Sequence, residues 1–561
     1  MTLKSLFSRF DRDTLFHGAK GVAFAAGGMV LVLAILLIAQ YFQVRAVDPI
    51  DAKPLQVMME RMKENPQDAA LRDQIRALDL LARKAYFTSQ WQLRTGGMLL
   101  LMAVGLLLGA LKVMRDLSKR LPTPEGCADY SDHWLIAARA RRWIAVCGLT
   151  LVSTSLVAAA ISHCDMNAQG GAPQKTATLE DFNKNWANFR GPGGNGVATA
   201  DQAPTAWNVA TGEGVKWRVQ PPLPGFSSPV IWGKRLYITG ADEQSQQLYA
   251  YDAESGKLIW THDANDVEGS PAGPPDVHSD TGYAPSTTAT DGTHVCAVYP
   301  TGDLVCVDAD GKRLWAQNLG KPDNHYGHSS SLMIHENILI VQWDQNRSSK
   351  LLGIDLSTGE TVWRSPRTVI SWSSPIVVNT GGRYELILTN SQSVESFDPK
   401  TGIKLWGENV MGGEMGPSAA FADGYVFAAN DYALVAGLKL TADGAEVAWE
   451  YDENMPDTAS PLANEEVLII ACSYGVIVCL DAKTGEALWE EEFDDGFYAS
   501  PILVGDKVYA TDLQGTVHIF KMAKTYELIG TAKLGETASA TPAAVNGRLY
   551  HRGEKYLYCF E

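Results

Sequence analysis

The stretch QLYAYDAESGKLIW, residues 247–260, combines a short apolar strand pattern with a turn from Asp252, a glycine at Gly256 and a tryptophan at Trp260. A glycine fits a turn that needs positive φ, and an aspartate can accept hydrogen bonds from the turn amides. Repetition of one such unit predicts an array of similar small β-sheets. The order Asp, Gly, Trp recurs at Asp308–Trp315, Asp355–Trp363, Asp398–Trp406 and Asp481–Trp489.

Each repeat contains this turn and four short strands. The repeats follow one another about every 40–55 residues, which is the range of propeller blades. A Ser/Thr-Pro or similar small-residue start leads the first strand of each unit. We therefore predict an all-β domain, an eight-bladed β-propeller over residues 185–561. The first strands begin at Ser228, Pro285, Ser330, Ser374, Pro417, Pro461, Pro501 and Pro542.

The two ends of the repeat array complement each other. The last unit stops at residues 556–561 without a fourth strand, whereas residues 215–219 form a fourth strand that precedes the first complete unit. Pairing the two removes an exposed sheet edge. The sequence therefore predicts ring closure between the N- and C-terminal strands.

Tryptophans recur in the fourth strand, and we interpret them as structural, because each large ring fills the wedge between neighbouring blades. These blade tryptophans are Trp217, Trp260, Trp315, Trp363, Trp406, Trp449 and Trp489. The position two before the end of the third strand takes small residues, including Cys306, Cys479 and Cys559. These cysteines are expected to be buried fillers rather than partners in disulfides.

Three apolar stretches precede the propeller, at about residues 21–44, 95–114 and 143–164, and each is interpreted as a transmembrane helix. A cleaved signal peptide is the alternative for the first stretch. Basic residues crowd the second loop, which predicts a cytoplasmic N-terminus and an extracytoplasmic propeller. Residues 45–94 are expected to form an extracytoplasmic helical loop, and residues 165–184 a polar linker. The predicted location is the bacterial inner membrane, multi-pass.

Charge divides the chain unevenly. Of 47 Lys and Arg and 64 Asp and Glu, 25 and 48 fall after residue 184, so the propeller carries a net charge of 25 − 48 = −23. An acidic domain excludes nucleic acid as a natural partner. The acidic run at residues 490–495 is interpreted as a solvated blade edge, with binding of a cation or a basic partner as the alternative.

The Asp-x-x-x-Gly-x-x-x-Trp repeats, together with the segment NWANFRGPGGNG at residues 185–196, resemble the pyrroloquinoline-quinone-like (PQQ-like) β-propeller superfamily, and within it the BamB-like propellers. That resemblance implies a protein-binding platform. The chain departs from the lipoprotein pattern, because residues 160–164 lack a lipobox. Residues 191–196 are read as a turn, since no phosphate-loop lysine follows them.

Quinoprotein dehydrogenases share the fold that this resemblance implies, and membrane glucose dehydrogenases also place membrane helices before the propeller. Those enzymes are expected to use longer propeller chains, a Glu/Asn/Asp set for Ca²⁺ and often an adjacent cysteine pair. The repeats here leave little room for such insertions. We therefore expect no cofactor, with PQQ and Ca²⁺ as the alternative, and we assign no catalytic residue.

Two connections between blades carry the remaining candidate ligands. Residues 261–283 include Asp276, His278 and Asp280, and the next connection includes His325 and His328. If these side chains converge beside the central channel, they can bind a divalent metal or a ligand, or move protons. The alternative is that they bond turn backbone and line a wet channel.

The favoured hypothesis is a membrane-anchored, non-catalytic protein-binding scaffold or adaptor in envelope protein assembly. Its expected partners are a protein at the membrane or in the periplasm, and the lipid bilayer through the three helices. A PQQ- or metal-dependent quinoprotein oxidoreductase is one alternative. An accessory subunit of a membrane electron-transport or secretion complex is the other.

Overall fold

The computed structural model describes residues 12–46, 99–100, 102–115, 117–118, 177–273 and 277–561. The chain divides into two compact units, Met1–Pro173 and Gln174–Glu561. In the first unit, helix α2 spans Arg12–Ala46. Its segment Thr14–Leu33 is the one described stretch of helix that is long and apolar enough to cross a membrane. The second predicted span is helical at all of its described positions between residues 99 and 115, but no second described helix is long and apolar enough to cross a membrane.

The third predicted span and most of the loop at residues 45–94 lie outside the described residues. The last residues of the predicted linker are helical: helix α6 spans Leu179–Lys184. Thr178 starts it with a capping box, in which its hydroxyl accepts from the amide of Asp181 and the Asp181 carboxylate accepts from the amide of Thr178.

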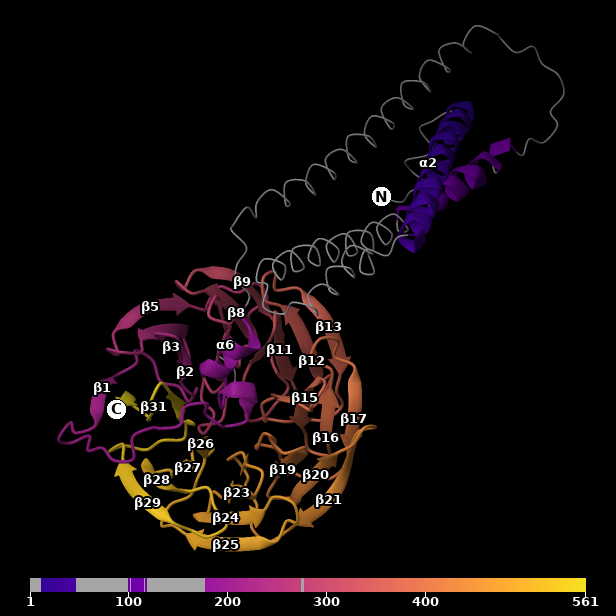
Figure 1. Cartoon of the computed structure of the whole chain (residues 1–561). Helices are drawn as coiled ribbons and strands as arrows, with labels where there is room; N and C mark the ends of the chain where they lie inside the picture. Colours follow the sequence, from indigo (N-terminus) through magenta and orange to yellow (C-terminus); the bar gives the residue numbers. More distant parts are fainter. Residues whose placement is uncertain (1–11, 47–98, 101, 116, 119–176, 274–276) are drawn as a thin grey trace, which may run out of the picture. The chain divides into compact units, whose positions relative to one another are not determined.

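The second unit contains eight four-stranded antiparallel sheets, which confirms the predicted eight-bladed propeller. Blades one to four consist of β2–β5 (Val230–Trp232, Arg235–Ala241, Gln246–Asp252, Leu258–Asp263), β6–β9 (Ala289–Thr290, His294–Val298, Asp303–Asp308, Arg313–Asn318), β10–β13 (Met333–His335, Ile338–Trp343, Lys350–Asp355, Thr361–Pro366) and β14–β17 (Ile376–Asn379, Tyr384–Thr389, Val394–Phe397, Lys404–Glu408). In Figure 1 the fourth strands, such as β5, β17 and β25, form the rim.

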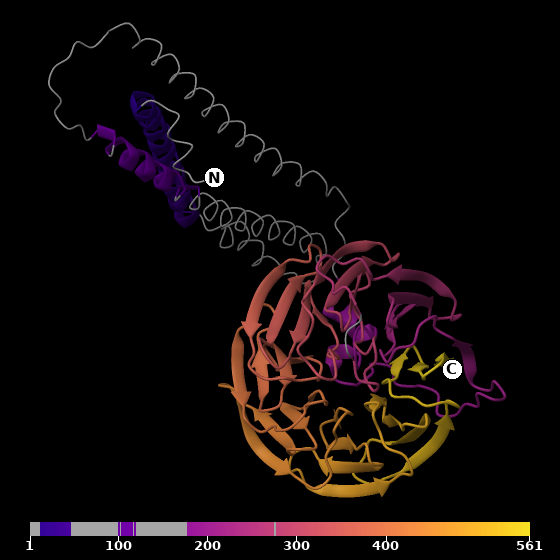
Figure 2. The ribbon, with the colours of Figure 1, turned by 180° about the vertical axis from the view of Figure 1, so that it is seen from behind.

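Blades five to seven repeat the same order, and blade eight takes its outer strand from the start of the domain. They consist of β18–β21 (Ala420–Ala422, Tyr425–Ala429, Val435–Leu440, Ala445–Tyr451), β22–β25 (Leu462–Ala463, Val467–Ala471, Val476–Asp481, Ala487–Glu492), β26–β29 (Ile502–Val504, Lys507–Thr511, Thr516–Lys521, Leu528–Lys533) and β30–β32 (Ala543–Val545, Arg548–Arg552, Leu557–Phe560) with β1 (Val215–Val219). Strand β1 pairs antiparallel with β32, so the predicted ring closure is confirmed; Figure 2 shows β1 beside the C-terminal strands.

The blade tryptophans dock on the turn of the following blade. The ring of Trp217 lies over Gly256, where an added Cβ would stand 2.7 Å from Cδ2 of the ring, and φ at this glycine is 69°. The indole Nε1 of Trp217 donates to the carbonyl of Ala253 at 3.0 Å. A glycine is therefore required here both for the turn and for the contact. Equivalent indole bonds join Trp260 to Ala309, Trp315 to Leu356, Trp449 to Ala482 and Trp489 to Ala523.

The small residues of the third strand lie opposite these tryptophans in the β-ladder. Gly353 pairs with Trp363, and an added Cβ at Gly353 would collide with that indole ring. In blade seven the large residue lies on the third strand and the small residue on the fourth, because Ile519 is paired with Gly530. Among the described residues the cysteines are free and buried, as expected for fillers: Cys296, Cys306, Cys472, Cys479 and Cys559.

A ring of hydroxyl groups joins the blades around the central channel. Seven of its eight members accept a hydrogen bond from the backbone amide of the counterpart in the preceding blade, at 2.8–3.1 Å, and Ser228 begins the series as an amide donor. These bonds satisfy amides that lie at the start of the first strands. Hydroxyls at repeat starts therefore link each blade to the next. The ring contains Ser228, Thr287, Ser331, Ser374, Ser418, Ser460, Ser500 and Thr541.

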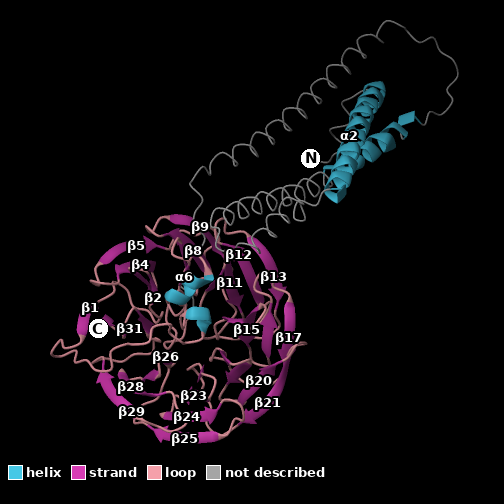
Figure 3. Ribbon diagram, viewed as in Figure 1, coloured by secondary structure: helices cyan, strands magenta, loops and turns pink. Residues whose placement is uncertain are grey.

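Residues 186–198, here called the crosspiece, bond to five different blades. Trp186 exchanges backbone bonds with Ile231 of blade one, and the amide of Thr290 in blade two donates to Ala187. Arg190 donates to carbonyls of Ala419 and Pro461, at the starts of blades five and six. Leu503 in blade seven exchanges backbone bonds with Gly196 and Ala198. The short helical segments α6 and η2 (Pro192–Gly194), cyan in Figure 3, lie within the ring in this view.

Candidate functional site

The connections between blades enclose a cavity of about 410 Å³ around the channel, here called the mouth. All eight connections contribute to it, and the hairpin between β19 and β20 adds a ninth segment. The mouth is thus built by the whole ring rather than by one blade. Its lining residues are Phe226, Asp280, Thr281, Pro285, Tyr326, Ser329, Trp372, Glu414, Gly416, Asp431, Tyr432, Asp457, Thr458, Tyr498 and Ser539.

The mouth leads to a smaller cavity of about 140 Å³ that is lined by the hydroxyl ring and by Phe189 of the crosspiece. The two cavities share one lining residue from every blade connection. Each shared residue lies two positions before a member of the hydroxyl ring, so one position of the repeat forms the neck of the channel. The shared residues are Phe226, Pro285, Ser329, Trp372, Gly416, Thr458, Tyr498 and Ser539.

Two of the predicted site histidines lie beside Tyr326 at the mouth. The imidazole of His278 stands edge-on to the Tyr326 ring at 5.3 Å between centroids, and its Nδ1 lies 3.7 Å from Oδ2 of Asp280. His325 packs on Tyr326 at 4.2 Å, and its Nε2 lies 3.2 Å from Oε1 of Glu414. The structure therefore brings the two predicted loops together at Tyr326.

His328 does not join them, which corrects the predicted convergence of three histidines. Its side chain is buried, and its ring packs on Trp343 at 4.3 Å. Its Nε2 is buried without a hydrogen-bond partner. Burial lowers the pKa of His328 to about 3. The neutral ring is therefore a core residue under the loop, and the spacing of His325 and His328 places them on opposite sides of that loop.

The remaining predicted ligand, Asp276, lies outside the described residues. Among the residues that the structure describes, no group of three His, Cys, Asp or Glu side chains is placed to hold a metal ion. A metal site generally needs three or more protein ligands. The described part of the two loops therefore supplies fewer ligands than the predicted metal site requires.

Burial of His328 makes stability depend on pH. A histidine whose folded pKa lies below the unfolded value of 6.5 stabilises the fold above pH 6.5, and that contribution is lost as the pH falls toward 3. As the pH falls from 6 to 4.5, the unfolded wild type takes up about one proton more than the folded protein. We therefore expect the free energy of unfolding of the wild type to fall by roughly 1.4 kcal/mol per pH unit more than that of His328→Phe. Urea unfolding of the full-length protein in detergent, at pH 7 and at pH 4.5, measures this difference.

The matched control is His278→Phe, because that side chain is exposed at the mouth. It should leave the pH dependence of unfolding unchanged. His551, which is also buried and whose pKa burial lowers to about 4, will keep part of the acid sensitivity in both variants. An unchanged slope in His328→Phe would contradict the burial of a neutral His328.

Carboxylates dominate the charge of the mouth. Asp280, Glu414, Asp431 and Asp457 line it, and no lysine or arginine is among its described lining residues. Oδ1 of Asp457 is buried without a hydrogen-bond partner. Burial, followed by the carboxylates of Asp457 and Asp280, raises the pKa of Tyr498. The mouth is therefore an electronegative site with aromatic walls.

This charge does not fit PQQ, the cofactor that the dehydrogenase alternative requires. PQQ carries several carboxylate groups, and like charges at close range repel strongly where water is partly excluded. The described lining offers carboxylates where that cofactor needs cationic or hydrogen-bond-donating side chains. Arg552 borders a neighbouring cavity, but its NH1 already donates to Ser227 and Thr239.

Sequence reasoning missed most of the mouth, including Phe226, Trp372, Tyr432 and Tyr498. A signal was present for three of them, since Phe226, Trp372 and Tyr498 occupy one position of the aligned repeat, three residues before a proline. Tyr432 and Asp431 sit on a hairpin, and no repeat position identifies them. His328 was selected instead because its side chain is titratable, but the burial of that side chain follows only from the packing of the loop.

Comparison with known proteins places the chain in a family. The profile of the family described as outer membrane protein assembly factor BamB matches residues 191–325 and 390–560, more than half of the chain. A search of the curated proteins found no match.

Solved structures share the fold. Quinohemoprotein alcohol dehydrogenase ADHIIG from Pseudomonas putida HK5 is 12% identical, with a TM-score of 0.51 over 68% of this chain and 81% of that chain. The corresponding enzyme of Comamonas testosteroni is 14% identical, with a TM-score of 0.51 over 67% and 80%. BamB from Moraxella catarrhalis is 18% identical, with a TM-score of 0.48 over 62% and 97%. By its profile match, the chain belongs to the family of outer membrane protein assembly factor BamB.

Proposed function

We propose that the chain is a membrane-anchored, non-catalytic scaffold that binds a protein partner outside the cytoplasm, in envelope protein assembly. The observation that carries this proposal is the mouth, an open, aromatic and acidic surface to which all eight blade connections contribute. Membership of the BamB family supports a role in protein assembly. A surface built from every blade of a closed ring presents fixed contacts to a partner.

Preorganisation is the mechanism that this proposal requires. Association costs less when the contact loops are already ordered. The long connection after β5 is tied down at its start by Arg313, whose guanidinium donates to the carbonyls of Asp263 and Asn265 at 2.7 and 2.8 Å. Ser270 of the same connection donates to the buried carboxylate of Asp303 at 2.7 Å. Side chains of blade two thus hold the first part of this connection, residues 263–270.

Helix α2, together with the two further spans predicted at about residues 95–114 and 143–164, anchors the scaffold in the inner membrane under this proposal. The apolar segment Thr14–Leu33 supports the first of these spans. Anchoring restricts the search for a partner to the membrane plane, which raises the effective concentration of both proteins. The N-terminus is then cytoplasmic and the propeller extracytoplasmic.

Site-specific photo-cross-linking in intact membranes tests the scaffold role. A photoreactive phenylalanine analogue replaces Tyr432, which lies at the mouth with 74% of its surface exposed. The matched control places the same analogue at Ile403, which is 64% exposed and precedes the outer strand β17. A discrete protein adduct from position 432 alone is expected. Equal labelling from both positions, or a stoichiometric quinone in the purified protein, would overturn the proposal.

A further inference from the structure

We propose that the mouth receives the cationic side chain of a lysine or arginine from a basic segment of the partner protein. This inference rests on the proposed scaffold function and specifies the chemistry of its contact. Its first support is charge, because four carboxylates line a cavity in which the described lining residues include no lysine or arginine. Among the described residues, the hydroxyl of Tyr326 donates to Glu414 at 2.9 Å and His325 approaches its other oxygen at 3.2 Å.

The second support is an unsatisfied acceptor. Oδ1 of Asp457 is buried without a hydrogen-bond partner in a residue that lines the mouth. Leaving a buried polar atom unpaired costs about 1–3 kcal/mol, and more for a charged group. The Asp457 side chain as a whole is only partly buried, so a small rotation of its carboxylate presents this oxygen to an ammonium or guanidinium group in the mouth, and the new bond removes the cost. Such a charge-assisted bond is stronger than a neutral one.

The third support is the aromatic wall. A cation over the face of an aromatic ring is attracted by its quadrupole, and the attraction grows when the site is desolvated. Tyr326 and Trp372 pack edge to face at 5.2 Å, and the indole Nε1 of Trp372 donates to Oδ1 of Asn324 at 2.8 Å. The rings are therefore held in place before a ligand arrives. Rings and carboxylates together select a positive charge with an apolar stem.

A lysine or arginine side chain matches both parts of this lining, because each has an apolar stem that ends in a charged head. The cavity beyond the neck is smaller than the mouth, about 140 Å³ against about 410 Å³. An extended segment can therefore lie across the mouth while one side chain enters it. The acidic charge of the propeller, −23 by the counts above, favours approach of a basic segment at long range.

Peptide binding to the full-length protein in detergent tests this inference. The probe is a fluorescein-labelled decapeptide of alternating lysine and serine, and its fluorescence anisotropy is measured with the wild-type protein and with the double variant Asp457→Asn/Glu414→Gln. We expect the double variant to bind at least about tenfold more weakly, since it loses two charged acceptors of nearly unchanged shape. Acetylation of the peptide lysines should abolish binding to both proteins.

The matched control is Glu492→Gln/Asp494→Asn, which removes two charges from the acidic run outside the mouth. It should change the affinity less than about twofold at physiological salt. An equal loss in the control would overturn the inference in favour of diffuse attraction to the acidic surface. Binding of free spermidine as tight as that of the peptide would overturn the assignment to a protein segment.

Failure of this inference is separable from failure of the scaffold proposal. The photo-cross-link from position 432 is repeated in the Asp457→Asn/Glu414→Gln background. Loss of the partner adduct supports insertion of a cationic side chain. A retained adduct, with peptide binding unchanged, overturns the cationic contact and leaves the scaffold function standing.

Discussion

Replacing Arg190 by alanine is expected to lower the free energy of unfolding of the propeller by about 2–5 kcal/mol. The side chain is fully buried in the crosspiece, and it donates to carbonyls of Ala419, Pro461 and Asn195. Alanine leaves these buried acceptors unpaired and opens a cavity between blades five and six. The bond network that joins the crosspiece to this side of the ring is then lost. Urea unfolding of the full-length protein, followed by tryptophan fluorescence, measures the change.

The matched control for this prediction is Arg347→Ala. Arg347 is exposed, and its guanidinium meets Asp323 at 2.9 Å on the surface. Exposed ion pairs contribute about 0–1 kcal/mol, so the control should unfold nearly as the wild type does. Similar midpoints for Arg190→Ala and Arg347→Ala would show that the crosspiece is not held through Arg190. A lysine at position 190 should recover only part of the stability, because it cannot reach the separate carbonyls in fork geometry.

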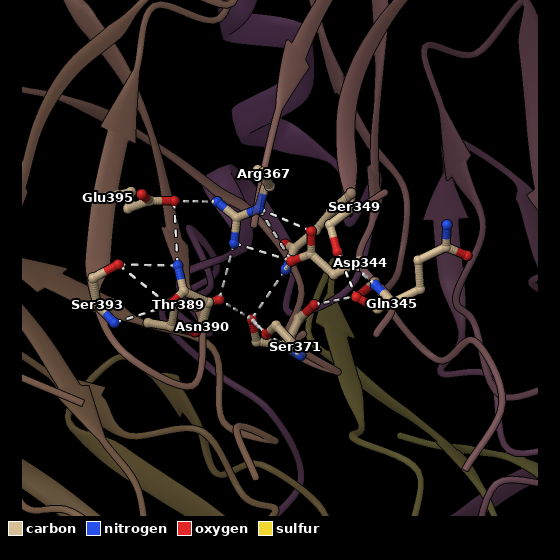
Figure 4. Close-up of polar contacts among 12 residues, drawn as sticks. Asp344, Gln345, Ser349, Arg367, Ser371, Thr389, Asn390, Ser393 and Glu395 are labelled. Carbon is tan, nitrogen blue, oxygen red and sulfur yellow. Dashed lines mark hydrogen bonds and ion pairs between the residues drawn. The ribbon is translucent and has the colours of Figure 1, made fainter. Parts of the chain in front are cut away.

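Replacing Arg367 by alanine is expected to lower the free energy of unfolding of the propeller by about 3–5 kcal/mol. Its guanidinium is buried between blades three and four, with Nε at 2.9 Å from Oδ1 of Asp344 and NH1 at 2.6 Å from Oε2 of Glu395. Figure 4 shows these contacts and the bond from NH2 to the carbonyl of Thr389. Removal of the cation leaves the carboxylate of Asp344 charged and buried.

A double variant distinguishes loss of the ion pair from burial of a lone charge. Arg367→Met/Asp344→Leu replaces both partners by apolar groups of similar size, and such replacements are often nearly neutral. The double variant should therefore be more stable than Arg367→Ala, measured by the same urea unfolding. Glu395 keeps a partner in both variants, because Lys404 bonds its other oxygen at 2.6 Å. A double variant as unstable as the single one would contradict this explanation.

The repeat pattern predicted the propeller because each blade is a local structure. The Asp, Gly and Trp of a turn lie within about ten residues, and four short strands that pair in sequence order form one antiparallel blade. Ring closure was also predictable, since the incomplete last unit and the extra strand at residues 215–219 leave a single way to pair both edges. The small residue opposite each tryptophan was recognised from alignment alone, and the structure adds the reason, which is contact with the indole ring.

The site was predictable only in part. His278 and His325 were placed correctly near one another, because loops at equivalent repeat positions meet at the channel. His328 was placed wrongly, because the side of the loop on which it packs depends on Trp343 from another strand. Within the crosspiece, residues 191–196 were interpreted as a turn, and the bonds of the whole segment to five blades could not be inferred from a segment that has no repeat.

The sequence by itself determined the number of blades, their closure and the acidic charge of the ring, since these properties depend on residue order and composition. Only the tertiary structure decided which side chains gather at the mouth. Asp280, Tyr326, Glu414 and Asp457 come from four connections that lie far apart in the chain. The curvature of the closed ring brings them together, because each blade turns its connection toward one shared axis, and no local pattern encodes that distance.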